Sequence, residues 1–105
     1  MSYQTILASL GAGIFLCNSL PHLISGLRGD KFPTPFAKPS GIGNSSPLCN
    51  FLWGAFNLII GCDLWSVAQF MIGLNSETFV FFVGFIFMGI FSSLHFGRVR
   101  NKKPL

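Results

Sequence analysis

The sequence predicts an all-α membrane protein, a three-helix transmembrane bundle, and its composition and the distribution of its apolar residues lead to that prediction. Half of the 105 residues are apolar, only 10% are charged, and 13 are phenylalanine. A soluble domain carries about a quarter charged residues, so this chain has too little charge to cover a water-facing surface. The apolar residues fall in three long blocks, as expected of membrane spans. At this length we expect a single membrane domain over residues 1–105.

The first block predicts a span over about residues 3–25. It lacks the basic start of a signal peptide, so we expect it to be retained as a helix. Pro21 should kink or end that helix, and Gly26 is suited to cap it. Small residues at four-residue spacing would let another helix approach closely, and these are Ala8, Ser9, Ala12 and Gly13.

A connector rich in proline and glycine follows, over residues 26–46, and its composition excludes a helix through most of it. Its FPTPF motif places two aromatic rings beside two prolines, namely Phe32, Pro33, Pro35 and Phe36. Because aromatic residues are rare in disordered segments, we expect an ordered loop. Its Phe rings would enter the membrane interface or fold back onto the helices. A loose surface tether is the alternative.

The second span is predicted over about residues 47–74 and begins with Ser46 as an N-cap before Pro47. A helix of that length measures roughly 40 Å, which exceeds a hydrocarbon core of about 30 Å. The third span is predicted over about residues 77–97, with Asn75 or Ser76 as its cap. A second set of small residues at four-residue spacing lies on it: Gly89, Ser93 and Gly97.

The basic residues predict the orientation of the chain. Three lie in the connector (Arg28, Lys31 and Lys38) and four in the tail over residues 98–105 (Arg98, Arg100, Lys102 and Lys103). Both segments should therefore be cytoplasmic, with the N-terminus outside. The basic residues behind the net charge of +4 are confined to these two segments at the ends of the spans. We therefore expect the lipid bilayer as a partner, and no nucleic acid.

Polar side chains on all three predicted spans lie in the cytoplasmic half of the bilayer, at about 1.5 Å of rise per residue. They are Asn18, His22, Asn57, Ser92 and His95. One interpretation is a polar pocket at the helix interface, with the connector as its floor. The alternative is structural, because interhelical hydrogen bonds are common in membrane bundles and contribute about 0.6–2 kcal/mol each.

Two further hypotheses concern single groups. His22 and His95 could bind a metal or haem together, but no third ligand accompanies them and we expect no cofactor. Asp63 is predicted slightly past the middle of the bilayer, where a carboxylate is costly and marks a proton or cation site of a small transporter or channel. The alternative is an aspartate near a tilted outer end, reached by water.

A pattern over residues 18–57 resembles small uncharacterised bacterial multi-span membrane proteins. In these, N-S-x-P-H-x-x-x-G-x-x-G precedes T-P-F and later N-x-x-W-G. The matching residues are Asn18, Ser19, Pro21, His22, Gly26, Gly29, Thr34, Pro35, Phe36, Asn50, Trp53 and Gly54. The resemblance implies a bacterial inner membrane and an important connector.

Catalytic motifs are missing from the sequence, with no nucleophile elbow, HExxH or phosphate loop. We therefore do not expect an enzyme. Three short helices enclose little volume, so we expect a homo-oligomer or docking onto a larger membrane complex. The sequence favours a non-catalytic accessory or interaction subunit, with the Asp63 transporter as the alternative.

Overall fold

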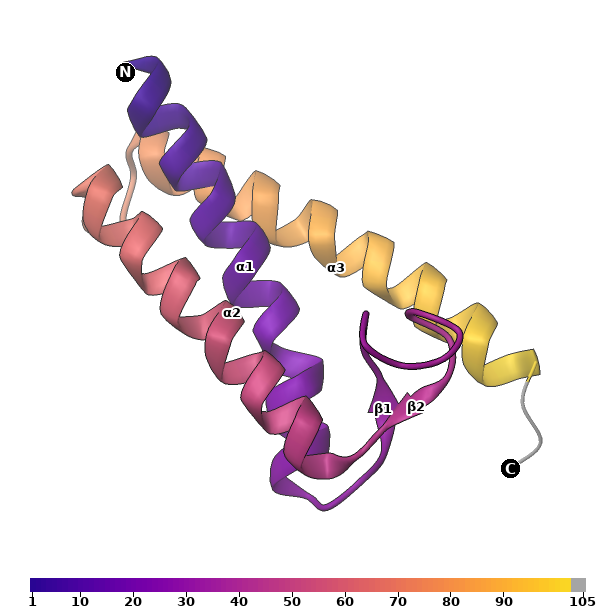
Figure 1. Ribbon diagram of the computed structural model, residues 1–105. Helices are drawn as coiled ribbons and strands as arrows, with labels where there is room; N and C mark the ends of the chain where they lie inside the picture. Colours follow the sequence, from indigo (N-terminus) through magenta and orange to yellow (C-terminus); the bar gives the residue numbers. More distant parts are fainter. Residues whose placement is uncertain (103–105) are drawn as a thin grey trace.

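The computed structural model describes residues 1–102, and most of these belong to three long helices (Figure 1). Helix α1 covers Tyr3–Leu27, α2 covers Pro47–Ala68 and α3 covers Ser76–Lys102. All three are long and apolar enough to cross a membrane. This confirms the prediction of an all-helical chain with three candidate transmembrane segments.

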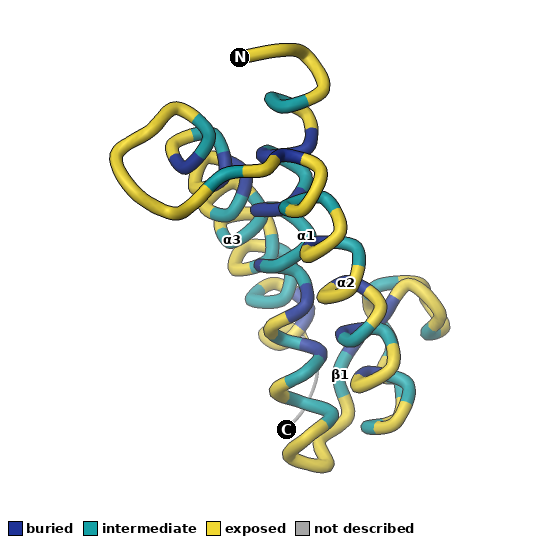
Figure 2. Tube along the Cα trace, turned by 90° about the vertical axis from the view of Figure 1, so that its left-hand side faces the viewer, coloured by how far each residue is buried: buried dark blue, intermediate teal, exposed yellow. Residues whose placement is uncertain are grey.

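Helix α1 is the centre of the fold. Helices α2 and α3 both pack along α1 but scarcely touch each other. Figure 1 shows them on either side of α1 and spreading apart toward the end where residues 28–46 lie, which we call the loop end. The buried residues follow the contacts with α1, while much of α2 and α3 is exposed (Figure 2). The third helix is thus open to its surroundings along much of its length.

Small residues allow the backbones of α1 and α3 to touch. A Cβ added at Gly13 would clash with the carbonyl oxygen of Phe81, and one added at Gly84 would clash with that of Leu10. Contact between backbones at this range maximises dispersion attraction and is the usual use of small residues in membrane helices. The four small residues predicted as a contact face of the first span are all buried: Ala8, Ser9, Ala12 and Gly13.

The other predicted set of small residues is not used in the same way. A Cβ added at Gly97 would meet nothing within 4 Å, and one at Gly89 would only reach ordinary contact with Cys17 Sγ at 3.6 Å. Ser93 is exposed, and its Oγ donates to the carbonyl oxygen of Gly89 in its own helix at 2.8 Å. This edge of α3 therefore lies mostly outside the contacts of the described chain.

The end of α1 differs from the prediction. The helix continues through Pro21 to Leu27, and Arg28 caps it instead of Gly26. Gly26 has another role, because a Cβ there would lie 2.6 Å from the backbone nitrogen of Phe51 on α2. Gly29 supplies the turn beyond the helix, with a φ of 75° that favours glycine.

Helix α2 ends at Ala68, so the predicted end at residue 74 was wrong. Gln69 takes the left-handed conformation, with φ 54° and ψ 55°, and its N–H donates to the carbonyl oxygen of Trp65. Trp65 Nε1 then donates to the carbonyl oxygen of Phe70 at 2.8 Å. The apolar sequence runs on past this point, so hydropathy did not mark the end. The 22 residues of α2 still measure about 33 Å.

Both predicted N-caps are present. Ser46 Oγ accepts from the Cys49 N–H at 3.1 Å, and Asn75 Oδ1 accepts from the Thr78 N–H at 2.8 Å. Helix α3 does not stop at residue 97 but continues through Arg98 and Arg100 to Lys102. Lys103 and the rest of the predicted basic tail lie outside the described residues.

Residues 28–46 fold back between α2 and α3 at the loop end (Figure 1). Strand β1, Phe32–Pro33, pairs antiparallel with β2, Asn44–Ser45, and Phe32 lies opposite Ser45. Within the intervening turn, the carbonyl oxygen of Thr34 accepts from the N–H groups of Ala37 and Gly41, at 3.1 and 2.9 Å. The loop and the C-terminal part of α3 thus share one end of the molecule.

Candidate functional site

Two asparagines join α1 to α2 beside the loop end. Asn57 Nδ2 donates to the carbonyl oxygen of Trp53 at 2.8 Å, and Asn57 Oδ1 accepts from Asn18 Nδ2 at 3.0 Å. A backbone carbonyl can only accept, so the bond to Trp53 determines which way both amides point. Asn18 Oδ1 has no hydrogen-bond partner among the described residues.

His22 and Asn50 join the same two helices to the loop. Asn50 Nδ2 lies near three backbone carbonyl oxygens, those of Phe32, Ser45 and Ser46, at 2.8, 3.3 and 3.1 Å. Its Oδ1 therefore faces His22 Nδ1, at 2.9 Å. Since Oδ1 can only accept, His22 Nδ1 carries the proton and donates. Asn50 is 0% exposed and His22 is 2% exposed, so this network is inside the protein.

His95 joins α3 to the loop in a similar way. Its Nε2 lies 2.7 Å from the carbonyl oxygen of Gly41, which again makes the histidine nitrogen the donor. The imidazole is nearly parallel to the Phe91 ring, with 5.8 Å between centroids and an interplanar angle of 2°. The loop is therefore bonded to α2 through Asn50 and to α3 through His95.

Aromatic rings bring the two histidines into one cluster. Phe96 on α3 contacts the His22 ring edge-on at 6.2 Å and the His95 ring at 5.0 Å. Phe32 from the loop packs against both Phe96 and His22, at 4.6 and 5.6 Å between centroids. Edge-on and tilted pairs at these distances are favourable. Helix α1, helix α3 and the loop therefore meet at this aromatic cluster.

A cavity of about 280 Å³ lies beside the cluster, and residues from every helix and from the loop surround it. We call it the loop-end cavity. Its lining residues are Asn18, His22, Pro33, Thr34, Pro35, Ser40, Gly41, Trp53, Met88, Phe91, His95 and Phe96. Most of the wall is apolar, and a few polar groups are set into it, which is the usual composition of a small-molecule site.

The structure brings together most of the predicted inner polar residues. Asn18, His22 and His95 line the cavity, and Asn57 is bonded to Asn18 at its border. Ser92 is not among the lining residues. Its Oγ donates to the sulfur of Met88 at 3.5 Å, and Met88 does line the cavity.

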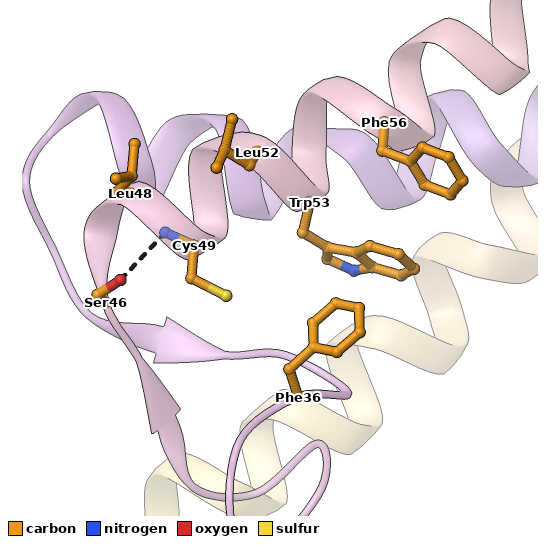
Figure 3. Close-up of a pocket in the computed structure, with 7 residues that line it drawn as sticks. All are labelled: Phe36, Ser46, Leu48, Cys49, Leu52, Trp53 and Phe56. Atoms are coloured by element: carbon orange, nitrogen blue, oxygen red, sulfur yellow. Dashed lines mark hydrogen bonds between the residues drawn. The ribbon is translucent and has the colours of Figure 1, made fainter.

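The four predicted connector residues take separate positions. Pro33 and Pro35 line the loop-end cavity, and Phe32 belongs to the aromatic cluster. Phe36 lies outside, against Trp53, with 5.2 Å between ring centroids. Figure 3 shows this pair at one side of an apolar groove, with Cys49 Sγ directed into it. The groove has a volume of about 550 Å³ and is lined by Phe36, Ser46, Leu48, Cys49, Leu52, Trp53 and Phe56.

Asp63 lies away from this site. Its side chain is exposed on α2, off the buried stripe of that helix, and within residues 1–102 it forms no ion pair. Of the small residues expected to leave space beside it, Gly13 and Gly84 close the contact between α1 and α3 instead, and Ala12 is fully buried. Asp63 is five residues from the end of α2 at Ala68, about 7.5 Å along the axis.

The histidine pair does not form a conventional metal site by itself. The described part of the chain contains no group of three or more His, Cys, Asp or Glu side chains that could hold a metal ion. Each histidine already donates one ring N–H, to Asn50 Oδ1 or to the Gly41 carbonyl oxygen.

Sequence reasoning did not single out two buried polar residues of the site. Asn50 and Thr34, which are 0% and 1% exposed, appeared only within the resemblance pattern. Thr34 Oγ1 lies 2.6 Å from Ser45 Oγ and accepts from the Phe36 N–H at 3.2 Å. The residues of that pattern gather at the loop end, and five of them line the cavity: Asn18, His22, Thr34, Pro35 and Trp53. The pattern was the signal that could have identified Asn50.

Three comparisons, with protein-family models, with curated proteins and with solved structures, found no match for this chain. Its candidate site is therefore interpreted from its own geometry.

Proposed function

We propose that this protein is a small integral membrane protein that acts as a non-catalytic accessory or interaction subunit of a membrane complex. The observation that carries the proposal is the open arrangement of the helices. Helices α2 and α3 both pack on α1 and scarcely contact each other, so each keeps a broad apolar surface for neighbours in the membrane. Exposed rings on α3 include Phe79, Phe82, Phe87 and Phe91.

The hydrogen bonds at the loop end support the same proposal. Asn50, His22 and His95 bind the loop to the helices, and Asn18 binds α1 to α2 through Asn57. These bonds stabilise a fixed shape, which an interaction subunit needs. They also support an ordered connector, which we place on the cytoplasmic side.

For the location, we propose a bacterial inner membrane with the N-terminus outside and the C-terminus cytoplasmic. The basic residues of the loop, Arg28, Lys31 and Lys38, lie at the same end of the fold as the basic end of α3. Concentration of Lys and Arg at one end favours that end as the cytoplasmic one. The resemblance to bacterial multi-span proteins agrees with this location.

Assembly with other subunits can be tested at the edge of α3 that carries Gly89, Ser93 and Gly97, most of which the chain itself does not cover. A tagged protein is purified from its own membranes in mild detergent, and its mass is measured by native mass spectrometry. We expect an oligomer or a defined complex, and we expect Gly97→Leu to weaken it. The substitution has room in the isolated chain, so helix content should not change. An inert monomer under all these conditions would contradict the proposal.

A second candidate function is a small oligomeric proton- or cation-linked transporter or channel that uses Asp63. It is favoured by one observation, an exposed carboxylate without an ion-pair partner on an apolar helix of the described chain. In this case a neighbouring subunit would cover Asp63. Proton flux into liposomes would then be abolished by Asp63→Asn, whereas a protein without flux would exclude this function.

A further inference from the structure

Backbone carbonyl groups determine the polarity of the loop-end cavity. The Trp53 carbonyl orients Asn57, which in turn orients Asn18, so that Asn18 donates through Nδ2 and keeps Oδ1 as an acceptor. The carbonyls around Asn50 orient that amide, so its Oδ1 accepts a hydrogen bond from His22 Nδ1–H. The neutral imidazole therefore keeps Nε2 as an acceptor.

A backbone carbonyl group also orients His95. Its Nε2–H donates to the Gly41 carbonyl oxygen, so the neutral ring keeps Nδ1 as an acceptor. Three side chains of the cavity, Asn18, His22 and His95, thus each retain an acceptor that has no partner among residues 1–102. The wall also contains a donor without a partner, because Trp53 Nε1–H is buried and forms no hydrogen bond within the described chain.

The types of side chain that line the cavity also restrict the charge that a ligand can carry. Among residues 1–102, no Asp, Glu, Lys or Arg lines the cavity. An anion would face the acceptors without a basic partner, and a cation would have no carboxylate to balance it. Burying an unpaired charge is far more costly than burying a hydroxyl group that is hydrogen-bonded. The lining therefore favours a neutral ligand that donates hydrogen bonds.

The walls and the volume indicate a single flat ring. Trp53, Phe91 and Phe96 provide aromatic walls, and Met88 provides a soft, adaptable one. A volume of about 280 Å³ lies at the lower limit of small-molecule sites, and it exceeds what a bare ion requires.

We propose that the loop-end cavity binds a neutral ring carrying hydroxyl groups, a phenol or quinol, whose one or two hydroxyl groups donate to acceptors among His95, His22 and Asn18. The ligand comes either as the headgroup of a membrane quinol or as a free phenol. Both sources present the same chemistry to the cavity. Binding of this kind is independent of whether the protein also joins a complex.

The test uses the full chain in lipid nanodiscs and isothermal titration calorimetry, with protein-free nanodiscs subtracted. The probe is tetramethylhydroquinone, kept reduced under anaerobic conditions, and its dimethyl ether is the matched control. The ether is more apolar and enters lipid more readily, but it cannot donate. We expect the quinol to bind at least about tenfold more tightly, because the ether covers the acceptors without donating a hydrogen bond to them.

Two variants test whether the quinol binds in the loop-end cavity. His95→Phe keeps a flat ring beside Phe91 but removes both nitrogens, and Asn18→Leu removes an acceptor on another helix. We expect each to weaken quinol binding by about tenfold, while Asn75→Ala, at the opposite end of the protein, binds as the unchanged chain does. Circular dichroism checks that each variant retains its helices.

A comparison of a decyl-tailed quinol with the tail-free probe separates the two sources. Tighter binding of the tailed molecule indicates a membrane quinol, and equal binding indicates a free phenol. The proposal is overturned if the ether binds as well as the quinol, or if both cavity variants bind it unchanged. Copper binding that depends on His95, without quinol binding, would assign the cavity to a metal instead and would also overturn it.

Discussion

His22 on α1 donates its Nδ1 hydrogen to Oδ1 of Asn50 on α2 across 2.9 Å, and both side chains are almost completely buried. Asn50 also holds both strands of the loop through the carbonyl oxygens of Phe32 and Ser45. One amide therefore links two helices to both sides of a hairpin. This relationship makes the loop part of the folded helical unit.

Substitution of Asn50 by Ala should destabilise the protein by roughly 2–4 kcal/mol, because His22 and several carbonyl groups would be buried without partners. Denaturant unfolding in detergent micelles measures the loss. Trypsin should also cleave faster after Lys31 in the loosened loop. The control, Asn75→Ala, removes the cap of α3 at the other end and should leave the loop protected. An Asn50→Ala protein with normal stability and a protected loop would show that this network is unimportant.

The bond between Asn18 and Asn57 should contribute a measurable coupling energy between α1 and α2. A double-mutant cycle with Asn18→Leu and Asn57→Leu isolates it, and we expect about 0.6–2 kcal/mol, the range found for interhelical bonds in membranes. Unfolding of all four proteins in mixed micelles supplies the values. Fully additive effects would mean that the two amides do not interact.

Gly84 and Gly97 lie on the same helix but should respond in opposite ways to alanine. A Cβ at Gly84 clashes with the backbone of α1, whereas one at Gly97 meets nothing within 4 Å. Gly84→Ala should cost about 1–3 kcal/mol through overpacking. Gly97→Ala should be neutral or stabilise the monomer by up to about 1 kcal/mol, since alanine is the better helix former. Thermal unfolding compares the two, and equal effects would contradict the packing of α3 on α1.

The proposed orientation can be tested with single cysteines. After replacement of Cys17, Cys49 and Cys62, one cysteine is introduced at Ser40 in the loop or at Ser76 at the start of α3, both exposed. In intact cells a membrane-impermeant maleimide should label Ser76→Cys, and it should label Ser40→Cys only after permeabilisation. The reverse pattern would place the loop outside.

Much of the candidate site could be predicted from the depths of polar residues along the predicted spans. Asn18, His22 and His95 were expected in the same cytoplasmic half of the bilayer, and all three line the same cavity. Asn50 was not expected there, because its importance depends on where the loop folds back, which helix periodicity does not show. Asp63 was expected beside a space, but the small residues opposite it serve the contact between α1 and α3.

The sequence by itself determined that the chain has three apolar segments long enough to span a membrane, because length and hydropathy are local properties of a segment. It also predicted the cap at Ser46 and limited the cap of the third helix to Asn75 or Ser76, because caps depend on neighbouring residues; the structure selects Asn75. Only the tertiary structure decided that α1 is central, that α2 ends at Ala68, and that the loop is bonded between α2 and α3. The central position of α1 and the bonding of the loop depend on contacts between residues far apart in the chain, which composition and periodicity do not describe. The end of α2 depends on the left-handed conformation of Gln69, which hydropathy does not mark.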